Sequence, residues 1–291
     1  MRFSYAESMI DPSMYLPLAR AVQAAGYDSM VVPDSVCYPE ESDSVYPFSP
    51  DGNREFLNGK PFIDPFVLAA AMGAVTEKLR FVTFVLKLPI RHPVLVAKQS
   101  NSVAVMCNGR FALGVGTSPW PEDYEICDVP WEGRGRRMDE SIEIIQGLGT
   151  GEFFGFKGQV YELEPVKISP VPESPVPLLV GGHGDAALKR AARVGDGWLH
   201  GGGDLSELPG MLGRLNDFRK QYGRQDLPFE VHVISADSYS VDGIKRLEEQ
   251  GVTDVIVGFR WPYVVEPDTE VLQTKVDNLN RYADEVIDKV R

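Results

Sequence analysis

A glycine-rich stretch in the second half of the chain has the composition of an anion-binding turn. Gly181, Gly182, His183 and Gly184 follow an apolar run and precede a helical pattern that begins at Asp185. The first N–H groups of a helix have no partner within it, the helix dipole favours negative charge there, and glycine lets an anion approach the backbone. The stretch therefore predicts a phosphate site, and the alternative is a tight strand-to-helix turn without a ligand. It has neither the Gly-Lys-Ser/Thr of a Walker loop nor the Rossmann glycine spacing.

Side chains that can donate or accept protons follow several other apolar runs. The candidates for acid–base catalysis are His200, Asp34 and Glu7. We take His200 as the first candidate and the two carboxylates as the second. Each also has a structural interpretation, because a histidine beside glycines is commonly a loop residue and an aspartate after a strand commonly caps a turn.

Eight apolar segments alternate with helical patterns along the chain. The predicted strands are 2–6, 29–33, 80–88, 110–116, 177–181, 197–201, 229–235 and 254–259. Several are continuous apolar runs, which are typical of parallel strands covered on both faces. Eight strand–helix units predict a closed (β/α)8 TIM barrel of the α/β class, although an open doubly wound sheet has the same alternation. In a barrel, the side chains named above would meet at the mouth where the strands end.

The predicted helices have recognisable ends. Asp64-Pro65 supplies an N-cap and a first-turn proline, and His92-Pro93 begins another helix that Asn108-Gly109 ends. A helix is expected at 12–25, ended by Gly26, and the helix after Asp64 is expected to reach Glu77. Apolar residues at helical spacing predict two further helices, at 134–148 and 272–290.

Two long segments interrupt the alternation. Residues 36–63 follow the second strand and carry the aromatic residues Tyr38, Tyr46, Phe48 and Phe56, whereas residues 151–175 precede the fifth strand and predict a small hairpin with a proline-rich continuation. Long structured loops in a barrel commonly shape the active site. Because single α/β barrels often reach this length, residues 1–291 are expected to form one domain.

Composition narrows the partners and the compartment. Lysine and arginine number 29 against 42 aspartates and glutamates, a net charge of −13 that repels nucleic acid and anionic membranes, so we expect neither as a partner. An anionic ligand then needs a local exception to the overall charge. No apolar run reaches the roughly 20 residues of a membrane span, and the three cysteines, Cys37, Cys107 and Cys127, lack metal-ligand spacing. We expect a cytoplasmic protein without a metal centre.

Longer stretches resemble a known family. The runs LRFVTFVLKLPIRHPVLVAKQSNSVAVMCNGRFALGVGTSPW (79–120) and WEGRGRRMDESIEIIQGLGTGEF (131–153), together with the opening of the chain, resemble the bacterial luciferase-like superfamily of flavin and deazaflavin oxidoreductases. The resemblance covers nearly the whole chain. The segments YPFSPDG (46–52) and PFIDPFVLAAAMGAVTEKLRF (61–81) are most similar to the branch that uses coenzyme F420.

The resemblance implies a set of cofactor contacts at matching positions. The third strand of the family holds a bulge with a non-proline cis peptide beneath the central ring, the fourth strand ends in cofactor-contacting residues, and the glycine stretch holds the phosphate. The implied contacts are Asp34, Thr83, Phe84, Val85, Thr117, Ser118, Val180, Gly181, Gly182 and His183.

One position departs from the family pattern. Members often have Asp-His at the end of the second strand, with the histidine near the ring, whereas this chain has Asp34-Ser35. Asp34 therefore keeps a cofactor-site role, but the acid–base assignments stay open.

The resemblance implies an F420-dependent oxidoreductase that transfers a hydride between the deazaflavin C5 and a small organic substrate, apolar or aromatic given the loop's rings. The alternatives are an FMN-dependent monooxygenase that uses reduced flavin and O2, a non-catalytic F420-binding protein, and a phosphate-binding isomerase or aldolase. The last is disfavoured because the sequence indicates no strand-end lysine with an acid–base partner. As dimers are common in the family, a homodimer is expected. Candidates to bind the acidic F420 tail are Lys87, Arg91, Lys189, Arg193 and Arg260.

Overall fold

The strands pair into one closed ring. The computed structural model describes residues 1–46, 49, 52–261 and 263–291, so Phe48 lies outside the described residues. Parallel pairing runs in the order β3-β2-β1-β11-β10-β9-β8-β5, and β3 also pairs with β5, which closes the barrel. The barrel strands are β1 (Arg2–Ala6), β2 (Ser29–Val32), β3 (Arg80–Thr83), β4 (Leu86–Lys87), β5 (Phe111–Gly116), β8 (Leu178–Gly181), β9 (Gly197–His200), β10 (Glu230–Val233) and β11 (Asp254–Val257). With β3 and β4 counted as one interrupted strand, the predicted (β/α)8 barrel is confirmed.

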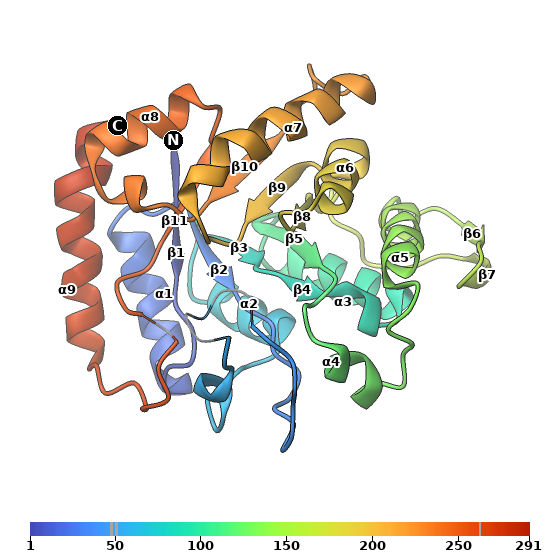
Figure 1. Cartoon of the computed structure of the whole chain (residues 1–291), viewed down its shortest axis with the longest axis horizontal. Helices are drawn as coiled ribbons and strands as arrows, with labels where there is room; N and C mark the ends of the chain where they lie inside the picture. Colours follow the sequence, from blue (N-terminus) through green and yellow to red (C-terminus); the bar gives the residue numbers. More distant parts are fainter. Residues whose placement is uncertain (47–48, 50–51, 262) are drawn as a thin grey trace.

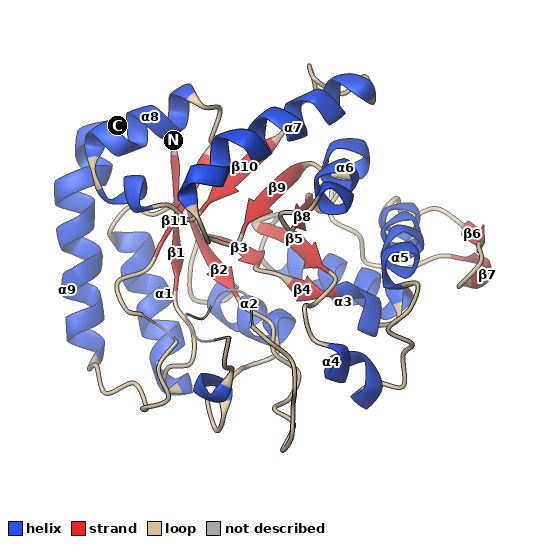
Figure 2. Ribbon diagram, viewed as in Figure 1, coloured by secondary structure: helices blue, strands red, loops and turns tan. Residues whose placement is uncertain are grey.

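Helices surround the ring of strands (Figures 1 and 2). They are α1 (Tyr15–Ala24), α2 (Pro65–Gly73), α3 (Pro93–Met106), α4 (Pro121–Ile126), α5 (Arg134–Gly149), α6 (Asp185–Val194), α7 (Leu208–Gln221), α8 (Val241–Glu249), α9 (Leu272–Tyr282) and α10 (Asp288–Val290). A π-helical turn, Ala283–Ile287, joins α9 to α10. The predicted hairpin is confirmed as β6 (Phe154–Lys157) and β7 (Glu162–Val166), which projects away from the barrel (Figure 1). No helix in the described part of the chain is long and apolar enough to cross a membrane.

The helix that follows Asp64 begins as expected but ends early. Asp64 caps α2 by accepting hydrogen bonds from the N–H groups of Phe66 and Val67. The helix ends at Gly73 rather than at Glu77 because the next segment binds a neighbouring helix instead. The Gln23 side-chain oxygen accepts from the N–H of Glu77 at 2.7 Å, so the chain leaves the helical path before that residue.

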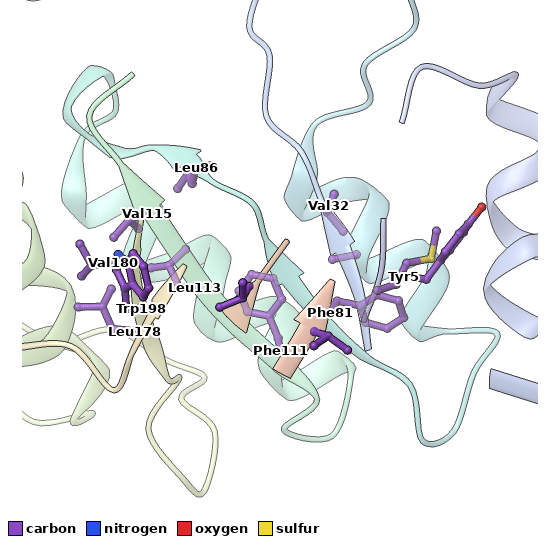
Figure 3. Packing of buried hydrophobic residues seen from close by; sticks show 14 of the residues in the cluster. Tyr5, Val32, Phe81, Leu86, Phe111, Leu113, Val115, Leu178, Val180 and Trp198 are labelled. Carbon is purple, nitrogen blue, oxygen red and sulfur yellow. The ribbon is translucent and has the colours of Figure 1, made fainter. Parts of the chain in front are cut away.

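The core has two layers, one outside and one inside the barrel. Large side chains on the outer face of the strands pack against the helices, as the close-up of Phe81, Phe111 and Trp198 shows (Figure 3). The interior is filled by a small cluster, one residue from each of six strands: Val31, Val82, Ala112, Leu179, Leu199 and Ile256. Phe84 and Val85 pack on this inner cluster. The barrel is therefore a filled core, and a ligand can bind only at its rims.

Charges close the rim at which the strands begin. Glu230 pairs with Arg80 at 2.9 Å and with His232 at 2.7 Å, while Arg2 pairs with Asp254 at 2.7 Å. Burial alone would raise the pKa of Glu230, but the His232 hydrogen bond and the Arg80 charge outweigh burial and lower it to about 2. Although the two acids and the histidine are close enough to ligate a metal, the two arginines already neutralise the carboxylates. We therefore interpret the charges at this rim as ion pairs that hold neighbouring strands together.

Candidate functional site

The third barrel strand is interrupted after Thr83, near its C-terminal end, by a cis peptide between Phe84 and Val85. The bulge that the family resemblance implied is therefore present, and it explains why the predicted strand 80–88 is split into β3 and β4. Thr83 fixes the bulge to β5, because its hydroxyl donates to the Gly114 carbonyl at 2.7 Å and accepts from the Gly114 N–H at 2.8 Å.

Glycines on the neighbouring strands make room for the bulge. A Cβ atom on Gly116 would lie 2.6 Å from the Val85 side chain, and one on Gly181 would lie 2.8 Å from it. Both distances are far below a normal carbon–carbon contact. Val85 thus packs directly on the backbones of β5 and β8, at the mouth formed by the strand ends.

The turn after β8 has the backbone that the glycine stretch predicts. Gly182 has a φ of +126°, and a Cβ there would lie 2.8 Å from that of Ala187, so a side chain is excluded both by conformation and by space. Its carbonyl accepts a hydrogen bond of 2.8 Å from the Trp198 indole. Helix α6 begins at Asp185, and the carboxylate of that residue is paired with Arg214 at 3.0 Å.

Two histidines stack beside this turn. The rings of His183 and His200 lie 4.6 Å apart and nearly parallel, and Nε2 of His183 accepts from the Gly201 N–H at 3.1 Å. His200 is fully buried, and burial, with a further contribution from His183, lowers its pKa to about 4. Burial lowers the pKa of His183 as well. His200 is therefore neutral near pH 7 and supports the His183 ring from inside, an arrangement that does not favour it as an imidazolium proton donor.

Both carboxylate oxygens of Asp34 are engaged, one by an ion pair and the other by a backbone N–H. One carboxylate oxygen accepts from Arg91 at 2.8 Å, and the other accepts from the Lys87 N–H at 2.9 Å. Its side chain is 1% exposed. Both oxygens are thus engaged in joining the end of β2 to the segment after β4, and the expected acid–base role of Asp34 stays a prediction.

Glu7 lies in a buried network of opposite charges. It accepts from Arg260 at 3.0 Å and from Lys275 at 3.1 Å, and Lys275 also contacts Asp268 at 2.8 Å and Glu270 at 3.0 Å. Burial alone would lower the pKa of Lys275, but its acidic partners outweigh burial and raise it. The network ties Arg260, Asp268 and Glu270 to the end of β1, and this placement favours an anchoring role for Glu7 over proton transfer.

The loop after β5 brings together residues that the sequence did not connect. The Thr117 carbonyl accepts from the Tyr124 hydroxyl, and Ser118, with a φ of +63°, donates to Asp123 at 2.6 Å. Asp123 is 2.7 Å from the ammonium group of Lys87. Lys87, at the end of β4, is therefore a strand-end lysine with an acidic partner, contrary to the expectation from the sequence. Asp123 was missed because it belongs to a short helix, α4, for which the sequence offers little periodic signal.

Aromatic residues from separate segments cover the mouth. Phe56, Leu57, Met9 and Trp120 form a buried cluster, against which Tyr38, Tyr46, Phe62 and Tyr263 pack. Tyr46 contacts Phe56, Trp120 and Tyr263 with ring centroids 5.4–5.6 Å apart. Ser44 holds the same loop to α4 by donating to Glu122 at 2.7 Å, and both segments lie at the same end of the barrel (Figure 1). The expectation that residues 36–63 help to shape the mouth is consistent with these contacts.

Of the basic residues expected to attract an acidic tail, four are paired with carboxylates. Arg91 pairs with Asp34, Lys87 with Asp123, Arg193 with Asp139 and Arg260 with Glu7. Lys189 lies 5.1 Å from the ring of Phe218. Position along the sequence located these cations but did not reveal their counter-charges.

The chain is similar in sequence to known proteins. A sequence profile described as luciferase-like monooxygenase matches residues 4–241. The chain is 61% identical to "Uncharacterized protein Rv0940c" of Mycobacterium tuberculosis (strain ATCC 25618 / H37Rv), with full coverage of both chains. It is 31% identical to the F420-dependent glucose-6-phosphate dehydrogenase of Nakamurella multipartita, over 77% of this chain and 64% of that protein.

The fold is shared with solved structures at low sequence identity. The monooxygenase RslO1 from Streptomyces bottropensis superposes with a TM-score of 0.77 at 15% identity, and the match covers the whole of both chains. Because the profile match covers most of the chain, we conclude that the chain belongs to the luciferase-like monooxygenase family.

Proposed function

We propose that the protein is an F420-dependent oxidoreductase that transfers a hydride between the deazaflavin and a small organic substrate. The observation that carries the proposal is the glycine-walled mouth, where Gly116 and Gly181 leave space for the bulge and Gly182 leaves its backbone bare. The relative named as an F420-dependent dehydrogenase supports deazaflavin as the cofactor. When bound, the deazaflavin would accept or supply the hydride at C5.

The residues at the mouth fit such a cofactor. Gly182 cannot carry a side chain without overlapping Ala187, so the start of α6 presents backbone to a phosphate. On our proposal Val180, Gly181, Gly182 and His183 hold the phosphate, and Thr83, Phe84 and Val85 support the ring. Thr117, Ser118 and Asp34 then border the ring from the neighbouring strand ends. The buried aromatic cluster would exclude water from the reacting atoms, and it favours a substrate with an apolar or aromatic body.

Titration of the purified protein with F420, followed by ligand fluorescence, tests this function. We expect saturable binding of F420 and, on mixing reduced F420 with a panel of enones, quinones and ketones, oxidation of the cofactor by at least one of them. Binding of F420 without turnover across a broad panel would favour a non-catalytic F420-binding role.

The second candidate is an FMN-dependent monooxygenase that uses reduced flavin and O2. The description of the matching family profile favours it. Because the two cofactors differ in their tails, a parallel titration with FMN separates the candidates. Tight FMN binding with no F420 signal would remove the leading proposal.

A further inference from the structure

Four hydrogen-bond donors without acceptors are concentrated beside the mouth. In the described part of the chain, Nε and Nη2 of Arg54, Nζ of Lys87 and Nε1 of Trp120 are buried and have no hydrogen-bond partner. Each of the three residues is 5% exposed. The guanidinium carbon of Arg54 lies 4.8 Å from the centre of the Trp120 ring, and Nζ of Lys87 lies 4.5 Å from it. The donors therefore belong to one cluster formed by Arg54, Lys87 and Trp120.

The nearby carboxylates balance the charge but do not use these donors. Asp123 lies 2.7 Å from Lys87 without hydrogen-bond geometry, while the same oxygen accepts from Ser118 at 2.6 Å. Glu122 lies 3.4 Å from Arg54, and its two oxygens accept from the hydroxyls of Ser42 and Ser44. The cluster is thus close to neutral, yet its donors remain unfilled.

Buried polar groups in folded proteins almost always have partners, and an exception commonly marks a site for a missing ion, water or ligand. Here all four unpartnered atoms are donors, so the missing group must be an acceptor that offers several oxygens. Guanidinium and ammonium groups bind carboxylates and phosphates with strong, charge-assisted hydrogen bonds. In a chain with a net charge of −13, the cluster would attract an anion through its unfilled donors and not through a net positive charge.

We propose that Arg54, Lys87 and Trp120 bind an oxyanion of the substrate, a carboxylate or a phosphate. The assignment of this anion to the substrate rests on the proposed function, in which the cofactor's own phosphate binds at Gly182, at the end of another strand. Beside the cluster, a hollow of about 150 Å³ is lined by Tyr38, Leu57 and Phe62 together with the polar residues Ser35 and Lys60, and it offers space for the rest of the ligand. The substrate class is therefore a small organic anion.

The indole N–H signals of the protein without cofactor, recorded by ¹⁵N NMR, test the proposal. The chain has four tryptophans, and Trp120→Phe assigns the signal of Trp120. We expect benzoate and inorganic phosphate to move that signal saturably, and sodium chloride at the same ionic strength to leave it unchanged. Arg54→Met should weaken the binding of both anions roughly tenfold to a hundredfold, the usual range for loss of a charged hydrogen bond.

A matched control is available at a second arginine–tryptophan contact. Arg134 lies 3.7 Å from the ring of Trp131, outside the cluster, so Arg134→Met should change neither anion affinity nor the Trp120 signal. Lys87→Met provides a second variant should Arg54→Met fail to fold. An unmoved Trp120 signal in the wild type, or equal anion affinity in wild type and the folded variants, would overturn the proposal.

Two titrations distinguish an anion of the substrate from an anion of the cofactor. Equal affinity of wild type and Arg54→Met for F420 supports a substrate anion. Weaker binding of F420 by the variant, with unchanged binding of the deazaflavin that lacks the phosphate and acidic tail, assigns the cluster to the cofactor and overturns the substrate assignment. Because the anion titration needs neither cofactor nor turnover, its failure is distinguishable from failure of the proposed function.

Discussion

Gly182 combines two requirements that glycine alone meets, a φ of +126° and a closest Cβ approach of 2.8 Å to Ala187. We expect Gly182→Asp to weaken F420 binding roughly tenfold or more, because it adds a side chain and a negative charge where the phosphate is proposed to bind. The measurement is the dissociation constant from F420 fluorescence.

Gly213 provides the matched control for the added charge. It lies on the exposed face of α7, and a Cβ there would meet nothing within 4 Å. Gly213→Asp should leave F420 affinity unchanged. If both aspartate variants bind F420 as the wild type does, the phosphate site is not at Gly182.

His200 makes the fold sensitive to acid. Its pKa falls from 6.5 to about 4 in the folded protein, so the unfolded chain binds the proton more readily. Its contribution to stability is therefore complete above about pH 6.5 and is lost as the pH falls towards 4. Between about pH 7.5 and pH 5 we expect the free energy of unfolding to drop by about 2 kcal/mol from this residue. Urea denaturation at both pH values measures the drop, and His200→Phe should lack this part of it.

At the scale of the elements, the bulge and its glycines are expected to act as a unit. Gly116→Ala should lower the free energy of unfolding by about 1–3 kcal/mol, since the new methyl group would lie 2.6 Å from Val85. Val85→Ala removes the overlapping atoms. The double variant Gly116→Ala/Val85→Ala should therefore lose less stability than the sum of the two single changes. Additive losses in urea denaturation would contradict direct packing between these positions.

The sequence alone predicts the elements well because their signals are local. Asp64 caps α2 through bonds to residues two and three positions away, and continuous apolar runs such as 111–116 are long enough to identify buried strands. The early end of α2 could not be predicted in this way. It depends on Gln23, a residue more than fifty positions away that only the folded barrel brings close.

The site is less predictable for the same physical reason. The resemblance correctly located the bulge at Phe84 and Val85. It did not reveal that Asp34, Glu7 and Lys87 each have a partner of opposite charge, because these ion pairs join strand ends and loops far apart in the chain. Arg54 carried no signal in the sequence, since a single arginine in a long polar loop is ordinarily a solvated residue.

At the scale of the whole molecule, we propose that the outer face of α2 and α3 binds a second copy of the chain. Helices α2 and α3 contact each other, and they leave Val67, Leu95 and Met106 61–71% exposed. Exposed apolar side chains on neighbouring helices are typical of interfaces between copies of a chain. We expect a homodimer by light scattering coupled to size-exclusion chromatography, and a monomer for Val67→Glu/Leu95→Glu. Substituting exposed Phe153 on the hairpin side with glutamate should leave the mass unchanged.

The packing of Val85 on two bare backbones also constrains how the family can diverge. Any side chain at Gly116 or Gly181 would overlap Val85. Changes at these three positions should consequently arise in concert during evolution, with bulk gained on one strand offset by bulk lost on its neighbour. Relatives that lack this covariation would present a differently shaped surface to their ligand at the mouth of the barrel.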